Sequence, residues 1–161
     1  TLDQVQKRIQ ELIEEGHGIQ RHGAQVTGVQ LEGRAVAGLD PITGTRVDGV
    51  HGGVHQHAQH ATKVVSDEAY VFAENFGRNS IQFVNKTTAS KTGLAQIEIP
   101  LREIYGEDFR FFVTGVTRYG SKANPLGYGA TIFNDNAYMI IRYKQNNSGS
   151  WKFQTMFPQP E

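Results

Sequence analysis

The spacing of the apolar residues changes once along the chain, at Gly77, and this change restricts the possible folds more than any other feature. Before Gly77 apolar residues recur every three or four positions, as in amphipathic helices. After it they alternate with polar residues, as in half-buried strands. Helices followed by strands favour an α+β domain, in which a helical part, residues 1–77, packs on a mainly antiparallel β-sheet formed by residues 78–161. A chain of 161 residues has the length of one domain and can bury a substantial core.

The helical part contains clear signals for the beginnings and ends of helices. Apolar residues at helical spacing run from Leu2 to Ile13, and Gly16 ends that pattern. Another helix is expected to begin after Ser66 and to end at Gly77, because Ser66 is a good N-cap and two acidic residues follow it. The apolar residues of this helix predict a buried stripe formed by Ala69, Phe72, Ala73 and Phe76.

The alternating pattern after Gly77 predicts six strands, at residues 81–84, 95–99, 109–118, 130–133, 138–144 and 151–157. Residues 100–106 are expected to form a helical turn, and residues 145–149 to close a hairpin between the last two strands. Strict alternation in the final strand puts four residues on one face: Trp151, Phe153, Thr155 and Phe157. Thr155 is then the single hydroxyl in an aromatic row, and it is expected either to pack through its methyl group or to donate a hydrogen bond to a ligand.

Two histidines near the N-terminus are candidates for a functional site. His17 and His22 lie in a segment that is interrupted by Gly16, Gly18 and Gly23. Such a segment is expected to be a loop whose backbone adopts positive φ and approaches a ligand, and loops of this kind often carry chemistry. The alternative for His17 is that its ring bonds the last carbonyl groups of the preceding helix.

Arg34 lies on a helix that the sequence marks at both ends. Thr27 and Gln30 form a capping box at its start, and Gly38 ends it. Arg34 shares a face of this helix with Leu31, and an unpaired cation on an apolar face is costly. We therefore expect an anion beside Arg34, either a bound ligand or a carboxylate of the protein.

Residues 39–53 are polar and rich in turn-forming residues, and we expect them to form a mobile loop beside the site. A histidine-rich tract follows, with His51, His55, His57 and His60. Imidazole is a common metal ligand, but the spacing of these residues matches no established zinc motif. The tract is therefore interpreted as a solvated loop or a wall of a cleft, and no metal or cofactor is predicted.

The order of these motifs resembles that of the RNase A-like toxin domains at the C-termini of bacterial contact-dependent growth inhibition proteins and related polymorphic toxins. The positions that carry the resemblance are Gly16, His17, His22, Thr27, Gln30, Leu31, Arg34, Thr155, Phe157 and Pro158. The resemblance implies a kidney-shaped, two-lobed α+β fold and a ribonuclease site formed by His22, Arg34 and Thr155. The family has a catalytic Tyr where this chain has Phe157, so the role of that hydroxyl stays open. Residues 39–53 resemble an insertion relative to the family.

Cleaving RNA without a metal requires two proton transfers and stabilisation of the charge that develops on the phosphate. Histidine suits both transfers because its ordinary pKa, about 6.5, lies near neutral pH. The donors of an arginine match phosphate oxygens. We therefore expect His22 to be the principal acid/base residue, Arg34 to bind the phosphate and Thr155 to be an auxiliary donor. The second proton-transfer residue stays open among His17, His60, Lys63, Tyr138 and Tyr143. The RNA is expected to contact His60, Thr62, Lys63, Tyr138 and Phe157.

Composition restricts the function only in part. The chain contains 16 Lys and Arg and 16 Asp and Glu, so it attracts RNA over a long range only weakly unless its basic residues gather in one cleft. The absence of cysteine excludes disulfides and thiolate chemistry. No apolar run approaches the roughly 20 residues that span a bilayer, and no signal-peptide pattern opens the chain.

The chain begins inside a helical pattern and is therefore expected to be a domain of a larger parent protein. The resemblance implies that this parent is secreted or displayed at the cell surface and delivers the domain into a competing bacterium. There the domain is expected to cleave RNA, with tRNA as a candidate substrate, in the cytoplasm of the target cell. The resemblance also implies a cognate immunity protein that protects the producing cell.

Two other function classes stay open. An ADP-ribosyltransferase toxin requires a catalytic Glu, and Glu98 is the only candidate on a predicted C-terminal strand. A non-catalytic binding module would use exposed aromatic residues, for which Tyr138, Tyr143 and Trp151 are the candidates.

Overall fold

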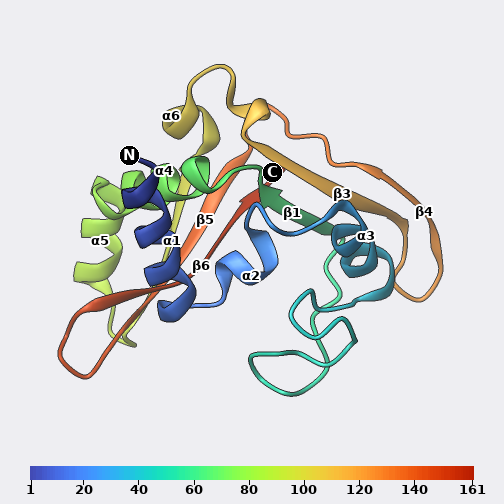
Figure 1. Ribbon diagram of the computed structural model, residues 1–161, viewed down its shortest axis with the longest axis horizontal. Helices are drawn as coiled ribbons and strands as arrows, with labels where there is room; N and C mark the ends of the chain where they lie inside the picture. The colour runs from blue at the N-terminus through green and yellow to red at the C-terminus, as the bar shows by residue number, and fades with distance from the viewer.

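The computed structural model describes residues 1–161 and shows an α+β fold, in which N-terminal helices are followed by two small antiparallel sheets (Figure 1). The helices are α1 (Leu2–Glu15), α2 (Gly18–His22), α3 (Gly28–Ala37), α4 (Asp67–Arg78), α5 (Ile81–Ala89), α6 (Leu101–Tyr105) and the short 3-10 helix η1 (Phe109–Phe111). The strands are β1 (His60–Val64), β2 (Leu94–Pro100), β3 (Val113–Gly120), β4 (Pro125–Ala130), β5 (Tyr138–Gln145) and β6 (Trp151–Gln159).

The two sheets have the strand orders β1-β3-β4 and β2-β5-β6, and they meet where β1 lies against β6. At this junction Thr62 Oγ1 in β1 donates a hydrogen bond of 2.6 Å to the carbonyl oxygen of Pro158 in β6. All four strand pairs are antiparallel. The prediction is therefore correct for the strand direction and wrong for the number of sheets.

The helices divide between the two sheets. Figure 1 shows α1, α4 and α5 beside the sheet β2-β5-β6, and α3 beside the sheet β1-β3-β4. A cluster of 20 buried apolar residues forms the core of the first group, and a cluster of four lies around α3. Helix α2 contacts both β6 and β1, so it lies at the junction of the sheets.

The predicted division into a helical part, residues 1–77, and a sheet part, residues 78–161, is only approximate. Strand β1 lies within the first part, where its sequence shows no regular alternation of apolar and polar residues. The strand predicted at residues 81–84 is instead the start of α5, because Ser80 accepts a hydrogen bond from the backbone N–H of Phe83 and caps a helix there. Helix α5 buries none of its residues, so its sequence lacks the stripe that identifies other helices.

The other strand predictions are confirmed in three cases and shifted in two. Strands β2, β5 and β6 lie where the alternating pattern predicts them, as do the helical turn α6 and the β5–β6 hairpin. The segment 109–118 begins with η1, and β3 starts only at Val113. The strand predicted at 130–133 lies earlier, as β4, because this exposed edge strand contains a proline and two glycines that resemble a turn.

The predicted buried stripe of α4 is partly wrong. Ala69 and Ala73 are buried, but the side chain of Phe72 is 53% exposed. Tyr70 and Glu74 are buried instead, and both make hydrogen bonds inside the protein. These bonds compensate for burying the polar groups, and a pattern based on apolar residues alone does not detect them.

Strand β6 contains a bulge, and the bulge changes which face of the sheet the following side chains point to. In the pairing of β6 with β5, Gln154 has no partner residue. Phe153 before the bulge and Met156 beyond it are therefore both fully buried in the core. Thr155 and Phe157 consequently lie on the opposite face from Phe153, and the predicted single row of residues in the final strand is wrong.

The bulge also explains Gly16. The backbone N–H of His17 donates a hydrogen bond of 2.8 Å to the carbonyl oxygen of Gln154, and a Cβ atom at Gly16 would overlap that oxygen. Gly16→Ala is therefore expected to lower the free energy of unfolding by roughly 1–3 kcal/mol, the usual cost of overpacking. Gly28→Ala is the control, because a Cβ there meets nothing within 4 Å, and this substitution is expected to leave stability unchanged or to raise it. Urea denaturation measures the stability of both variants. Equal stabilities of Gly16→Ala and Gly28→Ala would contradict the inference that β6 lies too close to Gly16 for a Cβ atom.

Candidate functional site

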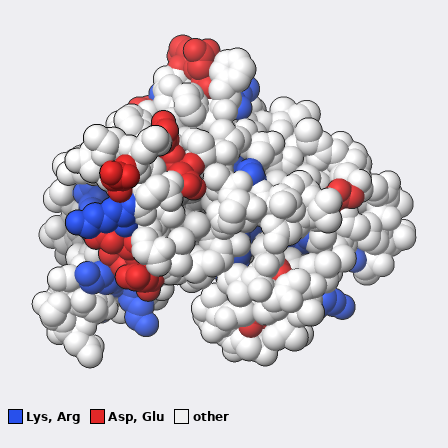
Figure 2. All heavy atoms as spheres, viewed as in Figure 1, with Lys and Arg blue, Asp and Glu red and all other residues white.

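A cavity of about 500 Å³ lies at the junction of the two sheets, between α2, α3, β1, the face of β5 and β6 that points away from the core, and the residues that precede β1. Figure 2 shows acidic and basic side chains interspersed over the side of the molecule where α1 and α4 lie. It also shows Lys or Arg atoms that lie deeper, near the centre of the view. Eight of the nine residues predicted to act in catalysis or substrate binding line this cavity: His17, His22, Arg34, His60, Thr62, Tyr138, Thr155 and Phe157.

The segment with the two N-terminal histidines is a short helix rather than the predicted loop. His17 is the N-cap of α2 and His22 its last residue. None of the three glycines around them adopts positive φ. Gly16 and Gly18 are needed instead because the backbone of β6 passes too close for a Cβ atom. The glycines therefore bring α2 against β6, and this contact places both histidines beside the final strand.

His22 is held in one orientation and one tautomer. Its Nδ1 donates a hydrogen bond of 2.8 Å to the carbonyl oxygen of Thr62, and its ring stacks on Phe157 with the centroids 5.0 Å apart. The remaining nitrogen, Nε2, then carries a lone pair, which accepts a hydrogen bond of 3.3 Å from the guanidinium of Arg34. Burial, and next the positive charge of Arg34, hold the pKa of His22 well below its ordinary value. In the free protein His22 is therefore a neutral proton acceptor.

Arg34 has no carboxylate partner. It projects from α3, whose capping box and Gly38 terminus are as predicted. No ion pair is formed by its guanidinium, and its buried Nε has no hydrogen-bond partner. Burial, and next the charge of Arg21, lower its pKa to about 10, so it stays positively charged at neutral pH. A buried cation with a free donor provides a binding position for an anion.

Thr155 lies on the cavity face of β6 because of the bulge. Its residue is buried, and its hydroxyl makes no hydrogen bond within the protein. Phe157 supports the ring of His22 from the same strand. His22, Arg34 and Thr155 therefore line one cavity.

The remaining predicted histidines differ in how they are held. The ring of His17 makes no hydrogen bond, so the alternative role in capping α1 is not observed. His60 Nδ1 lies 2.8 Å from Thr117 Oγ1. Burial lowers the pKa of both histidines, with a further lowering by the charge of Arg21 at His17 and of Arg118 at His60.

Three other predicted residues have structural roles. Lys63 does not line the cavity: its Nζ donates hydrogen bonds of 2.8 and 2.6 Å to the carbonyl oxygens of Ala24 and Val26. Lys63 is therefore not brought together with the other predicted residues, because β1 turns its side chain towards the segment before α3. Thr62 lines the cavity, but its hydroxyl hydrogen is used in the bond to β6. Tyr143 lies in the core and donates a hydrogen bond of 2.9 Å to Glu74, so it cannot replace the missing Tyr.

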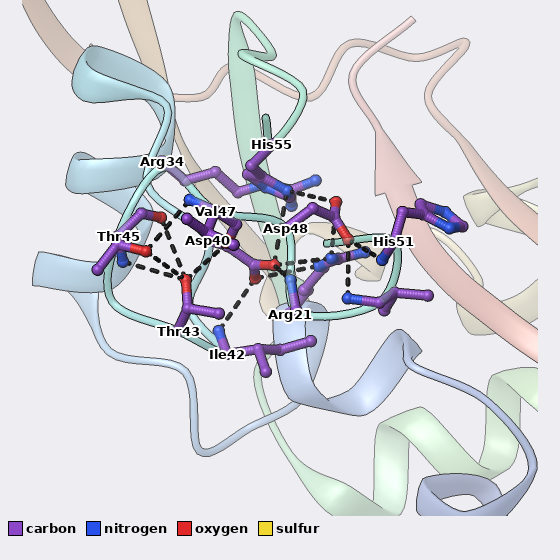
Figure 3. A network of polar contacts seen from close by, with 12 residues as sticks. Arg21, Arg34, Asp40, Ile42, Thr43, Thr45, Val47, Asp48, His51 and His55 are labelled. Carbon is purple, nitrogen blue, oxygen red and sulfur yellow. Dashed lines mark hydrogen bonds and ion pairs between the residues drawn. The ribbon is translucent and has the colours of Figure 1, made fainter. Parts of the chain in front are cut away.

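A buried ionic network forms one wall of the cavity (Figure 3). Asp40 accepts two hydrogen bonds from Arg21, at 3.2 and 2.8 Å, and Asp48 lies 3.1 Å from the same guanidinium. His55 Nδ1 lies 3.0 Å from Asp48. Both carboxylates also accept backbone N–H groups within residues 39–53. The segment that was expected to be a mobile loop is thus tied to α2, and it does lie beside the cavity.

The network resembles a cation site in its ligand types. Oxygen and nitrogen atoms of Asp40, Asp48 and His55 lie within 4.8 Å of one another. The guanidinium of Arg21 already bonds both carboxylates and supplies the positive charge there. The four residues of the histidine-rich tract do not converge on one point, since only His55 belongs to this group.

The network predicts a loss of stability in acid. Burial alone would raise the pKa of Asp40, but hydrogen bonds from Arg21 and from two backbone N–H groups lower it to about 2. A carboxyl whose pKa is lower in the folded than in the unfolded state contributes stability above the unfolded value, and this is lost as pH falls towards the folded value. We expect the wild type to lose about 1 kcal/mol through Asp40 between pH 5 and pH 3. Urea denaturation of Asp40→Asn should show a shallower dependence on pH, and an identical dependence would contradict this assignment.

Two arginines that were not predicted as site residues, Arg21 and Arg142, also line the cavity. Arg21 lies between the two histidines, and its position beside them was the available signal. Arg142 lies on β5, two residues from Ile140 and four from Tyr138, and these three alternate with core residues. A charged residue in an otherwise apolar alternating strand was the signal for Arg142. Its guanidinium lies 5.5 Å from the centre of the Phe157 ring.

Comparisons with protein-family models, with curated proteins and with solved structures found no match to the chain. None of its helices combines the length and the apolar character that crossing a bilayer requires.

Proposed function

We propose that the chain is a metal-independent endoribonuclease domain of the RNase A-like toxin type. The observation that carries the proposal is the convergence of His22, Arg34 and Thr155 on one cavity at the junction of the sheets. A neutral imidazole, a buried guanidinium without a carboxylate partner and a free hydroxyl are the groups that transesterification of a phosphodiester requires. The two sheets on either side of the cavity also fit the two-lobed fold that the resemblance implies.

The geometry supports a role for each residue. His22 Nε2 is the proton acceptor, and it takes the proton of the ribose 2′-hydroxyl when the 2′-oxygen attacks phosphorus. Arg34 binds the phosphate oxygens and stabilises the charge they gain, for which its unpartnered Nε is available. Thr155 donates its hydroxyl hydrogen to the phosphate. His17, His60, Tyr138 and Phe157 line the same cavity and are the residues that the flanking nucleotides would contact.

The proposed ribonuclease activity also suggests a biological role as a toxin. We propose that a larger secreted or surface-displayed parent delivers the domain into the cytoplasm of a competing bacterium, with tRNA as a candidate substrate. A cognate immunity protein would protect the producer by covering the cavity. Five of the six histidines and three arginines line the cavity, and Asp48 is its only acidic lining residue, so the covering surface is expected to be acidic.

The two alternative functions find less support. Glu98, the candidate catalytic residue of an ADP-ribosyltransferase, lies on β2 and does not line the cavity. The three aromatic residues of the proposed binding module do not form one surface, since Tyr143 is in the core and Tyr138 faces the cavity.

The chemistry of the products tests the proposal directly. Total RNA incubated with the protein in the presence of a chelator should be cut to fragments that end in a 2′,3′-cyclic phosphate and begin with a 5′-hydroxyl. Fragments that end in a 3′-hydroxyl, or intact RNA together with consumption of NAD, would overturn the proposal.

Arg34→Lys tests whether the planar set of donors matters in addition to the charge. We expect this variant to lose roughly 10²- to 10³-fold in the rate of RNA cleavage, because Lys cannot present the same fork of donors to the phosphate. Arg110→Lys is the matched control, since Arg110 is exposed and pairs with Asp135 outside the cavity. Initial rates under chelation measure both variants, and equal rates would remove Arg34 from the mechanism.

A further inference from the structure

His55 is an imidazole that the proposed mechanism has not used. It lines the cavity and is 4% exposed. Its Nδ1 lies 3.0 Å from Asp48 and 3.6 Å from Asp40, so its hydrogen is directed to these carboxylates. Its other nitrogen, Nε2, is buried and has no hydrogen-bond partner in the protein. A carboxylate that fixes one imidazole nitrogen and leaves the other available is a common arrangement in proton-transfer sites.

Charged side chains surround His55 and the cavity that it lines. Two carboxylates, Asp40 and Asp48, face this ring, and Arg21 bonds both of them. Two further arginines, Arg34 and Arg142, also line the cavity. Three guanidiniums thus face two carboxylates, which leaves one positive charge in excess at the cavity. A phosphodiester in the cavity carries one negative charge and would balance it.

We propose that His55 is the second proton-transfer residue of the site, the general acid that protonates the leaving oxygen, with Asp48 as its positioning residue. The inference rests on the proposed ribonuclease function. In the step, the 2′-oxygen gives its proton to His22 Nε2 and bonds to phosphorus. The bond between phosphorus and the 5′-oxygen breaks, and its electron pair takes the proton from His55 Nε2. The products are a 2′,3′-cyclic phosphate and a 5′-hydroxyl, and solvent later exchanges the proton between the two histidines.

The structure favours His55 over four of the five residues that the sequence left open. Lys63 is outside the cavity and Tyr143 is in the core. His17 and His60 line the cavity, but burial and a nearby arginine lower the pKa of each, and neither has a carboxylate partner. A general acid must hold its proton at the working pH, and such surroundings favour the neutral ring.

The experiment compares two substrates that differ in the leaving group. RNA has a poor leaving group, the 5′-oxygen of a ribose, which requires protonation. A ribonucleoside 3′-(4-nitrophenyl phosphate) releases a nitrophenolate, which leaves without a proton. His55→Asn keeps a donor near the Nδ1 position for Asp48 and removes Nε2. It should lose roughly 10²- to 10⁴-fold in RNA cleavage and less than about tenfold with the nitrophenyl substrate. The His22 variant His22→Asn should lose activity on both substrates.

The outcomes separate the inference from the function on which it rests. Wild-type protein that cleaves neither substrate overturns the proposed function itself. If the wild type cleaves both and His55→Asn is equally impaired with both, or impaired with neither, His55 is not the general acid. If His55→Asn does not fold, wild-type pH profiles decide instead. Activity on RNA should fall on the alkaline side, and this fall should be absent with the nitrophenyl substrate; a fall with both substrates overturns the inference.

Discussion

His22→Asn is expected to reduce RNA cleavage by roughly 10²- to 10⁴-fold, the usual contribution of a general base. The substitution removes Nε2, the only nitrogen of the ring that can take a proton from the substrate, because Nδ1 donates to the carbonyl oxygen of Thr62. Asn places an amide donor near the position of Nδ1, so the bond to Thr62 is retained. His22→Ala would remove this bond as well and leave a buried carbonyl oxygen without a partner, which costs additional stability.

The control for His22→Asn is a histidine that has a similar structural bond and lies outside the cavity. His57 Nε2 lies 3.0 Å from the carbonyl oxygen of Ala35, and Gln can place a donor near the position of Nε2. His57→Gln should therefore cleave RNA at the wild-type rate. Initial rates for both variants, with urea midpoints to show that both are folded, measure the effect. A folded His22→Asn protein with the wild-type rate would refute the assignment.

Asp40→Ala is expected to cause the largest loss of stability, about 3–5 kcal/mol, the usual cost of breaking a buried ion pair. Asp40 is fully buried and accepts hydrogen bonds from the Arg21 guanidinium at two positions. It also accepts the backbone N–H groups of Ile42 and Gly49. The substitution therefore leaves several buried donors without partners, and Arg21 retains only Asp48 as a counter-charge.

Asp135→Ala is the matched control for this prediction. Asp135 also accepts hydrogen bonds from two arginines, Arg102 and Arg110, but its side chain is 75% exposed. Exposed ion pairs usually contribute less than about 1 kcal/mol, because water and salt screen them. Urea denaturation at neutral pH should give a much lower midpoint for Asp40→Ala than for Asp135→Ala. Similar midpoints would show that the buried network contributes little to stability.

The parts of the fold that follow local chemistry could be predicted from the sequence. The capping boxes at Thr1 and Thr27 and the left-handed Gly38 depend on residues a few positions apart, and helices α1 and α3 lie where these signals place them. The β5–β6 hairpin is likewise a local structure. His22, Arg34 and Thr155 were chosen through the resemblance, and of these only Arg34 lies in an element whose form the sequence predicted in full.

The parts that follow from long-range contacts could not be predicted. At the bulge the carbonyl oxygen of Gln154 accepts a hydrogen bond from the backbone N–H of His17, and no local pattern in the final strand indicates this contact. The structure has two sheets where one was predicted, because β1 pairs with β3 in a sheet of its own. Strand β1 has mixed polarity, and β3 lies about fifty residues further along the chain. The proposed role of His55 depends on its contact with Asp48, which in turn pairs with Arg21. These three residues are far apart in the sequence or lie in polar segments, so no local pattern indicates that they meet.

The junction between β1 and β6 has a consequence for when the protein can act. Strand β6 follows all the other helices and strands of the structure, and it supplies Thr155, Phe157 and the carbonyl groups that anchor α2 and β1. A chain in which this strand is not docked has the two N-terminal histidines but no surface to hold them. The proposed ribonuclease activity therefore depends on the docking of β6 against α2 and β1.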